Sequence, residues 1–470
     1  MPVEDLAERE DATAPLTDEK SSQYEDETRR EIHKRVWALA WPLVLANLLQ
    51  TLNGFQDRFF VGHLGPDALA AAGVGGQLMF VLFGVAMSIS VGATALVARF
   101  KGANDLAQAR LATNQALWLA ALTSLICLAL TYPVREFVIR GMHIDAAATK
   151  LCIQYAGITL LGVPGLFVMM SLSSAYRGIG DMKTPLIVTI VVNLVHVLGN
   201  VLLIRGNLGF PALGLAGGAI ALVTSQYVGA LACLILLRRT SLAGSLRAAP
   251  RLSQEWAQRI LKIGIPALWQ NMSRIFSMLM FTLVLARAPE ATAAVAALTI
   301  GLTSESIAFM PGFAFSMAAS TLTGQALGAR DPRRAEQSAL VALQQGIVIM
   351  IVMGVVFFVF ARPFAHIFTD DSRVVDLTVS YLRIAAISEP FLALGMILTG
   401  ALNGAGETSS PAWASVFSMW AVRLGLAYAL ITVAHLGAVG GWWAMSLSTI
   451  VGGIAAYGLF RWIPWKEKKV

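Results

Sequence analysis

The chain has 470 residues, of which 56% are hydrophobic and only 13% are charged, and its mean hydropathy is +0.67. Soluble domains carry about 25% charged residues, so this composition excludes an ordinary soluble enzyme, a disordered protein and a nucleic-acid-binding protein. The apolar residues form long uncharged runs, such as 68–98 and 337–361, each longer than the ~20 residues that cross a bilayer. We therefore predict an all-α polytopic membrane protein.

The net charge of +7 combines an acidic start with a basic remainder. Residues 1–28 are rich in Asp and Glu and show no hydrophobic periodicity, so we expect a disordered acidic cytoplasmic tail. This segment lacks the basic and apolar stretches of a secretory signal. Cys127, Cys152 and Cys233 lie inside apolar runs without metal-binding or disulfide spacing, so we interpret them as buried thiols.

Apolar runs that end at charges, glycines or prolines predict twelve transmembrane helices. In chain order they cover about 36–61, 68–98, 111–134, 151–176, 184–204, 213–237, 258–286, 292–326, 337–361, 378–402, 411–433 and 440–463. Lys and Arg are concentrated in the segments that are cytoplasmic if the chain starts in the cytoplasm. The positive-inside rule therefore places both termini there.

The two halves of the sequence superpose when the chain is shifted by 226 residues. The matched pairs include Tyr155 with Tyr381, Pro164 with Pro390, Gly102 with Gly328 and Asp105 with Asp331. Each half has an even number of spans, so both halves start on the same side of the membrane. They are parallel repeats, related by an axis along the membrane normal.

This repeat divides the chain into five parts. We predict the acidic tail (1–28), an N-terminal six-helix lobe (29–237), a basic cytoplasmic linker (238–257), a C-terminal six-helix lobe (258–463) and a basic cytoplasmic tail (464–470).

Three sets of loop motifs carry a resemblance to a known family. The first is Pro42 followed by Asp57 and Gly62-His-Leu-Gly65, and the second is Gly324-Gln325-x-x-Gly328-Ala329. The third comprises Gly178, Gly180, Asp181 and Pro185, repeated as Gly404, Gly406, Glu407 and Pro411. On these residues the sequence resembles the multidrug and toxic compound extrusion (MATE) family of secondary transporters, over residues 30–465.

The resemblance implies a V-shaped pair of six-helix lobes in the bacterial inner membrane. Such a protein exports cationic or amphipathic drugs in exchange for H⁺ or Na⁺, with no cofactor, no enzymatic activity and no nucleic-acid partner. We expect a monomer surrounded by membrane lipid. A lipid or oligosaccharide flippase of the same superfamily is the alternative, which would favour two additional spans or a strongly basic centre.

Two further classes fit the sequence poorly. A major-facilitator transporter would show a Gly-x-x-x-Asp-Arg cluster between its second and third spans, and residues 99–110 contain none. A membrane enzyme would gather metal ligands or a nucleophile motif, but the chain has no HExxH or GxSxG motif in a fitting context. No Walker A motif is present, so ATP is not expected to drive transport directly.

Ionisable residues are costly inside a membrane and mark candidate functional sites. In the first lobe, Asn53 and Asp57 share one face of the first predicted span, and Asn193, His196 and Asn200 share one face of the fifth. Two polar stripes in one lobe should face each other to satisfy their hydrogen bonds. We interpret these five residues as a cation-coupling site centred on Asp57, with a structural hydrogen-bonded clamp as the alternative.

The resemblance assigns the cation site of this lobe to the first-span acid, two polar or acidic positions on span five and a threonine on span six. Asp57 matches, but His196 and Asn200 stand where the family often has Asn and Asp, and Leu222 stands in place of the threonine. Na⁺ needs several oxygen ligands, and these departures remove some of them. A carboxylate beside a histidine suits a proton better. We expect H⁺ coupling, with Na⁺ as the alternative.

The second lobe has two acids inside its predicted spans, Glu305 and Glu389, and two possible counter-charges, Arg274 and Arg423. One interpretation is a pair of buried ion pairs that fix the packing of the lobe. The other is a cation-attracting wall or a second proton site that contributes to substrate binding.

Overall fold

The structure is a computed structural model that describes residues 18–142, 145–249 and 251–468, with side chains from residue 29 onward. Within these ranges the chain is helical and contains no strand. Ten helices are long and apolar enough to cross a membrane, and a bent helix pair brings the number to eleven. The all-helical fold class predicted from composition is therefore confirmed.

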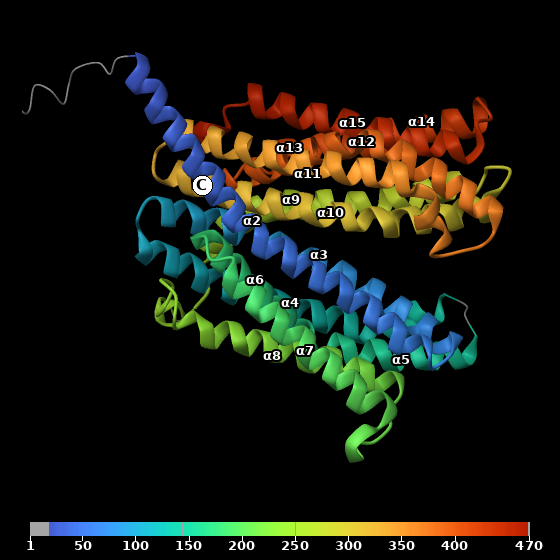
Figure 1. The fold of residues 1–470 in the computed structure, drawn as a ribbon. Coiled ribbons are helices and arrows are strands. Elements are labelled where there is room, and N and C mark those ends of the chain that lie inside the picture. The colour runs from blue at the N-terminus through green and yellow to red at the C-terminus, as the bar shows by residue number, and fades with distance from the viewer. Residues whose placement is uncertain (1–17, 143–144, 250, 469–470) are drawn as a thin grey trace, which may run out of the picture.

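The helices form two lobes, which lie one above the other in Figure 1. The first contains α2 (Asp18–Gly62), α3 (Pro66–Gly102), α4 (Leu106–Arg140), α5 (Ala146–Leu160), α6 (Val163–Ile179), α7 (Lys183–Arg205) and α8 (Leu215–Leu237). The second contains α9 (Gln254–Leu285), α10 (Ala291–Gly328), α11 (Pro332–His366), α12 (Ser372–Gly404), α13 (Ser409–Val416), η3 (Phe417–Leu424), α14 (Gly425–Tyr428), η4 (Ala429–Val433) and α15 (Gly437–Trp462).

Each predicted span lies on one of these helices, or on consecutive helices for the fourth and eleventh spans. Most of the helices extend a few residues beyond the predicted span, and α2 begins well before the first one. The fourth span is the bent pair α5 and α6, which meet at 44°. The seventh corresponds to α9, which is not among the ten apolar helices because Gln270, Asn271 and Arg274 lower its hydropathy. Residues 1–17 of the predicted acidic tail lie outside the described residues, and α2 includes the rest. The predicted linker ends in α9, which begins at Gln254.

Side-chain contacts confirm the 226-residue repeat. The Ser90 hydroxyl donates to the Met170 carbonyl at 3.3 Å, and Ser316 donates to Met396 at 2.7 Å. The ring of Tyr155 lies against Gly75 on α3, as the ring of Tyr381 lies against Gly301 on α10. Each of the two first-lobe pairs thus has its counterpart 226 residues further along the chain. The two lobes are structural repeats, as the sequence predicts.

The repeated glycine–acid motif forms the turn before the fifth span of each lobe, which begins with α7 in the first lobe and with α13 in the second. Gly180 and Gly406 adopt φ values of +85° and +82°, which glycine tolerates best. Asp181 then accepts hydrogen bonds from the backbone and hydroxyl of Thr184 at 3.0 and 2.6 Å. Glu407 accepts from the backbone and hydroxyl of Ser410 at 3.0 and 2.9 Å. Such carboxylate caps satisfy free N–H groups at a helix start.

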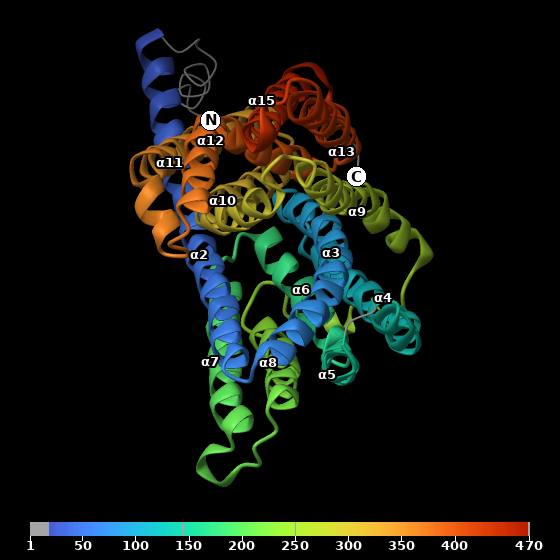
Figure 2. The same ribbon diagram turned by 90° about the vertical axis from the view of Figure 1, so that its right-hand side faces the viewer.

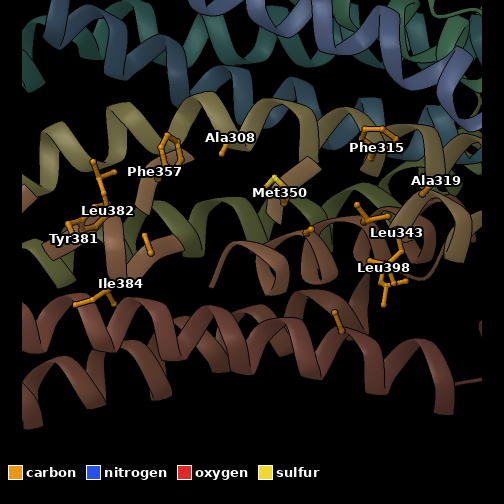
Figure 3. Close-up of a cluster of buried hydrophobic side chains, with 14 of the residues drawn as sticks. Ala308, Phe315, Ala319, Leu343, Met350, Phe357, Tyr381, Leu382, Ile384 and Leu398 are labelled. Carbon is orange, nitrogen blue, oxygen red and sulfur yellow. The ribbon is translucent and has the colours of Figure 1, made fainter. Parts of the chain in front are cut away.

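The core of the second lobe lies between α10, α11 and α12. Figure 3 shows part of this cluster, including Phe315, Met350, Phe357 and Leu398, all of which are fully buried. Many of the other buried side chains are alanines and glycines, which let helix backbones approach closely in a membrane.

The lobes meet most closely at one end of the molecule. We call this the terminal end; it carries the loops 103–105 and 329–331 and the C-terminal residues 463–468. From there the lobes diverge toward the opposite end (Figure 1). Between the lobes, α3 packs on α9 and α10 packs on α2, a reciprocal arrangement seen in Figure 2. The first half of α2 lies along the second lobe, and its second half packs on α7.

Candidate functional site

The first-lobe site joins α2 and α7 near the end of the molecule opposite the terminal end. The Nδ1 atom of His196 lies 3.1 Å from Oδ1 of Asn53, and its Nε2 atom lies 3.2 Å from Oδ1 of Asp57. The side-chain amide of Asn200 donates to the same Asp57 oxygen at 3.0 Å. The structure therefore brings the two polar stripes together through four of their five predicted members.

The fifth predicted member does not reach this cluster. Asn193 donates to the carbonyl of Thr189 on its own helix at 2.8 Å. Arg58, the neighbour that could neutralise Asp57, has an exposed side chain, and no ion pair joins the two within the described part of the chain.

The contacts of the His196 ring indicate how many protons the cluster holds, because both ring nitrogens face oxygen atoms. A neutral imidazole has one N–H and can donate to only one of the two partners. With the Asn53 oxygen facing Nδ1, either His196 is doubly protonated or Asp57 carries the proton and donates to Nε2. Both forms hold one extra proton. A deprotonated pair needs the Asn53 amide to rotate by 180°, so that its NH₂ group donates to Nδ1.

Sequence reasoning missed Tyr155. This residue lies on α5 against Gly75 and is close enough to Asp57 for an electrostatic interaction. Its counterpart Tyr381 also contacts an acid, because its hydroxyl donates to Glu305 at 2.6 Å. The pairing of Tyr155 with Tyr381 in the repeat was a signal that could have identified both residues.

The four charges predicted for the second lobe form no direct ion pair with one another in the part of the chain that the structure describes. No carboxylate oxygen of Glu305 or Glu389 lies within 4.0 Å of an arginine nitrogen in the described residues. Arg423, in a π-helical segment, donates to the hydroxyl of Ser448 at 2.9 Å. Glu305 and Arg423 interact electrostatically at longer range. The structure thus lacks the two ion pairs that one interpretation required.

Glu389 is the most isolated of these charges. Its side chain is 1% exposed, and neither carboxylate oxygen has a hydrogen-bond partner among the described residues. The Nε1 atom of Trp442, whose ring packs edge-on against Tyr381, is also buried without a partner there. A buried polar group without a partner is costly and calls for a bound proton, water or ion.

Arg274 has an exposed side chain on α9 and interacts electrostatically with Arg423 at longer range. Its guanidinium donates to Asn271 at 3.0 Å and lies 5.8 Å from the ring centre of Phe309 on α10. Asn271 is close to Gly84 of α3, so this face of α9 is turned toward the first lobe.

The loop motifs form the contact between the lobes at the terminal end. The Gln325 amide donates to the carbonyl of Gly178 at 2.9 Å, and the Thr321 hydroxyl donates to that of Arg177 at 3.1 Å. A Cβ on Gly102 would lie 1.8 Å from the Gln325 carbonyl oxygen, and one on Gly328 would lie 2.0 Å from that of Arg99. Glycine is therefore required at both positions.

Two parallel helical repeats with polar clusters inside each lobe are an arrangement found in secondary membrane transporters. The family model described as MatE matches residues 42–202 and 266–429. The chain belongs to the MATE family.

Known proteins agree with this assignment along the whole chain. A Thermotoga maritima protein named "Probable multidrug resistance protein NorM" is 30% identical over 447 residues, covering 94% of each chain. A Burkholderia vietnamiensis protein named "Multidrug resistance protein NorM" is 29% identical and covers 87% of this chain and 89% of its own. A crystal structure of a Vibrio cholerae MATE transporter superposes with a TM-score of 0.86 at 21% identity, covering 94% of this chain and all of that one.

Among the described residues, no group of three or more His, Cys, Asp or Glu side chains could hold a metal ion. The polar groups of the first-lobe cluster are one acid, one imidazole and two amides.

Proposed function

We propose that this chain is a secondary antiporter that exports cationic or amphipathic drugs in exchange for protons by alternating access. It works in the bacterial inner membrane with both termini in the cytoplasm, as a monomer without a cofactor or catalytic group. The terminal end is then the cytoplasmic end. The observation that carries the proposal is the contact of His196 with both Asp57 and Asn53.

The donor set around Asp57 supports H⁺ over Na⁺ as the coupling ion. Two nitrogen atoms, from His196 and Asn200, lie within 3.2 Å of the Asp57 oxygen. Na⁺ would require these positions to be filled by oxygen atoms. A proton needs only the carboxylate and imidazole pair, whose hydrogen bonds already accommodate it.

Proton binding changes which arrangement of the lobe is favoured, because a ligand shifts an equilibrium by its differential affinity for two states. When Asp57 is deprotonated, its carboxylate needs hydrogen-bond donors or water. When the pair is protonated, it can occupy a closed and drier bundle. A proton entering from outside would rearrange the first lobe and release substrate, and it would leave to the cytoplasm afterwards.

The second lobe contributes charge to substrate binding. Glu305 and Glu389 give this lobe two acids that interact with each other electrostatically, and the ring of Tyr381 lies beside Glu305. Aromatic faces together with carboxylates suit an organic cation.

A flippase for an anionic lipid or oligosaccharide is the second candidate function, and Arg274 is the observation that favours it. An exposed guanidinium on the side of α9 turned toward the other lobe would attract a phosphate group and repel a cation.

Transport in proteoliposomes tests both candidates. Efflux of a cationic dye should respond to an imposed pH gradient and not to a sodium gradient alone. Translocation of a fluorescent anionic lipid without dye transport would instead establish the flippase. A reporter that is active only outside the membrane, fused after Val470, should stay silent if the terminal end is cytoplasmic.

A further inference from the structure

The end of the chain folds back on the protein instead of leaving it. After α15, Trp465 is 2% exposed and begins the short helical turn η5 (Trp465–Glu467). Its ring stacks on that of Phe460 with centroids 4.9 Å apart, and its Nε1 donates to the Phe460 carbonyl at 2.8 Å. These contacts fix the position of the following residues at the terminal end.

Basic residues of this segment bind acids of the second lobe. Lys466 lies 2.6 Å from Glu336 on α11, which also pairs with Arg461 at 3.2 Å. The ammonium group of Lys468 pairs with Glu407, in the loop between α12 and α13. Together with the contacts of Trp465, these two ion pairs of Lys466 and Lys468 anchor the segment to its own lobe at three places.

Lys468 also contacts the other lobe. Its backbone carbonyl accepts a hydrogen bond of 2.7 Å from the Nη2 atom of Arg99, in the last turn of α3. A single residue thus joins Glu407 of the second lobe, through its side chain, to Arg99 of the first lobe, through its carbonyl.

The repeat explains why this contact is needed. Arg99 and Gln325 occupy equivalent positions, and each lies against a glycine of the opposite lobe. Gln325 closes its side of the interface by donating to the Gly178 carbonyl of the first lobe. Arg99 finds its partner in the C-terminal segment instead. The segment supplies an acceptor on the side where the repeat lacks the reciprocal bond.

We propose that residues 463–468 form an intramolecular latch that stabilises the conformation in which the lobes are closed at the terminal end. Opening that end separates Arg99 from Lys468, whereas the contacts of Lys466 with Glu336 stay within one lobe. Releasing Lys468 should therefore favour opening, and releasing Lys466 should not. The latch does not depend on which ion or substrate the protein carries.

Distance measurement between spin labels tests the latch in the full chain in lipid nanodiscs. Ala107→Cys and Arg333→Cys place labels on exposed, repeat-related positions of the two lobes, with Cys127, Cys152 and Cys233 replaced by alanine. The test variant ends at Glu467, which removes Lys468, Lys469 and Val470 but keeps Trp465. Lys466→Ala is the matched control. Glu407→Gln removes the charge that pairs with Lys468, while its amide oxygen can still accept the hydrogen bonds from Ser410.

The chain that ends at Glu467 should increase the ratio of the long-distance to the short-distance population by roughly threefold to tenfold, which is the size expected for the loss of a single partly exposed hydrogen bond. Glu407→Gln should give a smaller increase, and Lys466→Ala should match the parent. An unchanged distribution in the shortened chain, or an equal increase with Lys466→Ala, would overturn the latch. If the shortened chain cannot be purified, Glu407→Gln becomes the test variant. An unchanged population ratio in Glu407→Gln would then overturn the latch.

Discussion

The carboxylate of Asp57 and the imidazole of His196 face each other at 3.2 Å, but they differ in exposure: the Asp57 side chain is 38% exposed and that of His196 is 1% exposed. A proton that reaches the pair from solvent therefore meets Asp57 first. His196, buried and bound to Asn53, then links the carboxylate on α2 to the interior of the lobe. This asymmetry gives each residue of the pair a different expected phenotype.

Asp57→Asn should abolish efflux driven by a pH gradient while substrate binding is largely retained. The amide keeps the size of the side chain and can still contact Asn200 and His196, but it cannot take up a proton. Dye efflux and dye binding measured on the same proteoliposome preparation separate the two effects. Asn193→Ala, on the same α7 but bonded only to its own helix, is the matched control and should transport normally. Normal transport by Asp57→Asn would contradict proton coupling at this site.

The double variant His196→Asn with Asn200→Asp should acquire a response to sodium. It replaces a nitrogen donor with an amide oxygen and adds a second carboxylate beside Asp57, which gives a sodium ion more oxygen ligands. Efflux driven by a sodium gradient alone is the measurement, with the parent chain as the control. A parent chain that already responds to sodium would show that the nitrogen atoms around Asp57 do not select against that ion.

Glu389→Gln should leave the folded protein intact and weaken the efflux of cations. Among the residues that the structure describes, no arginine pairs directly with Glu389. The substitution therefore strands no counter-charge there and avoids the cost of several kcal/mol that follows the breaking of a buried ion pair. Thermal unfolding and dye efflux should be compared with those of Glu305→Gln, which alters the acceptor of the Tyr381 hydroxyl. A large drop in the melting temperature of Glu389→Gln would favour a structural role instead.

Much of the fold could be predicted from the sequence, because the length of the apolar runs, the charged, glycine and proline residues at their ends, and the internal repeat are local or periodic properties. The 226-residue shift even places the Tyr155 and Tyr381 contacts in register. The lack of a direct ion pair for Arg423 within the described residues could not be predicted, because Arg423 lies in a π-helical segment, whose side-chain directions differ from those of the α-helix that its sequence suggests. The sequence also suggested only a basic tail after residue 463. The bond from Arg99 to Lys468 spans 369 residues and has no periodic signal.

Gly102→Ala should prevent full closure at the terminal end. The added methyl group would lie 1.8 Å from the Gln325 carbonyl oxygen, so the backbones of α3 and α10 would have to separate. Overpacking of this kind costs about 1–3 kcal/mol, which is enough to shift a conformational equilibrium at least several-fold. The spin-label distances described above measure this separation.

Gly73→Ala is the control for Gly102→Ala, since it lies on the same helix and a Cβ there would meet nothing within 4 Å. Its distance distribution should match that of the parent chain. Equal distributions for the parent chain and Gly102→Ala would show that the interface can relax around the methyl group.

The contribution of Glu407 to stability should disappear in acid. Burial raises the pKa of its carboxyl, but the hydrogen bonds from Lys468 and Ser410 and the charge of Lys468 outweigh this effect, so the pKa lies below its usual value. A depressed pKa means that the carboxylate stabilises the closed, folded state at pH values above the ordinary glutamate pKa of about 4.3. This stabilisation is lost as the pH falls through the lower value of the folded state.

The melting temperature of the wild type should therefore exceed that of Glu407→Gln by a constant margin between about pH 6 and pH 8, where Glu407 is charged in both the folded and the unfolded state. The margin should shrink below about pH 4, as protonation removes the acceptor for Lys468 and makes the wild type resemble the glutamine variant. Lys466→Ala provides the comparison, because Lys466 pairs with Glu336 and not with Glu407. A margin that changes most near pH 7 would mean that a histidine or another group, and not Glu407, controls the stability of the terminal end.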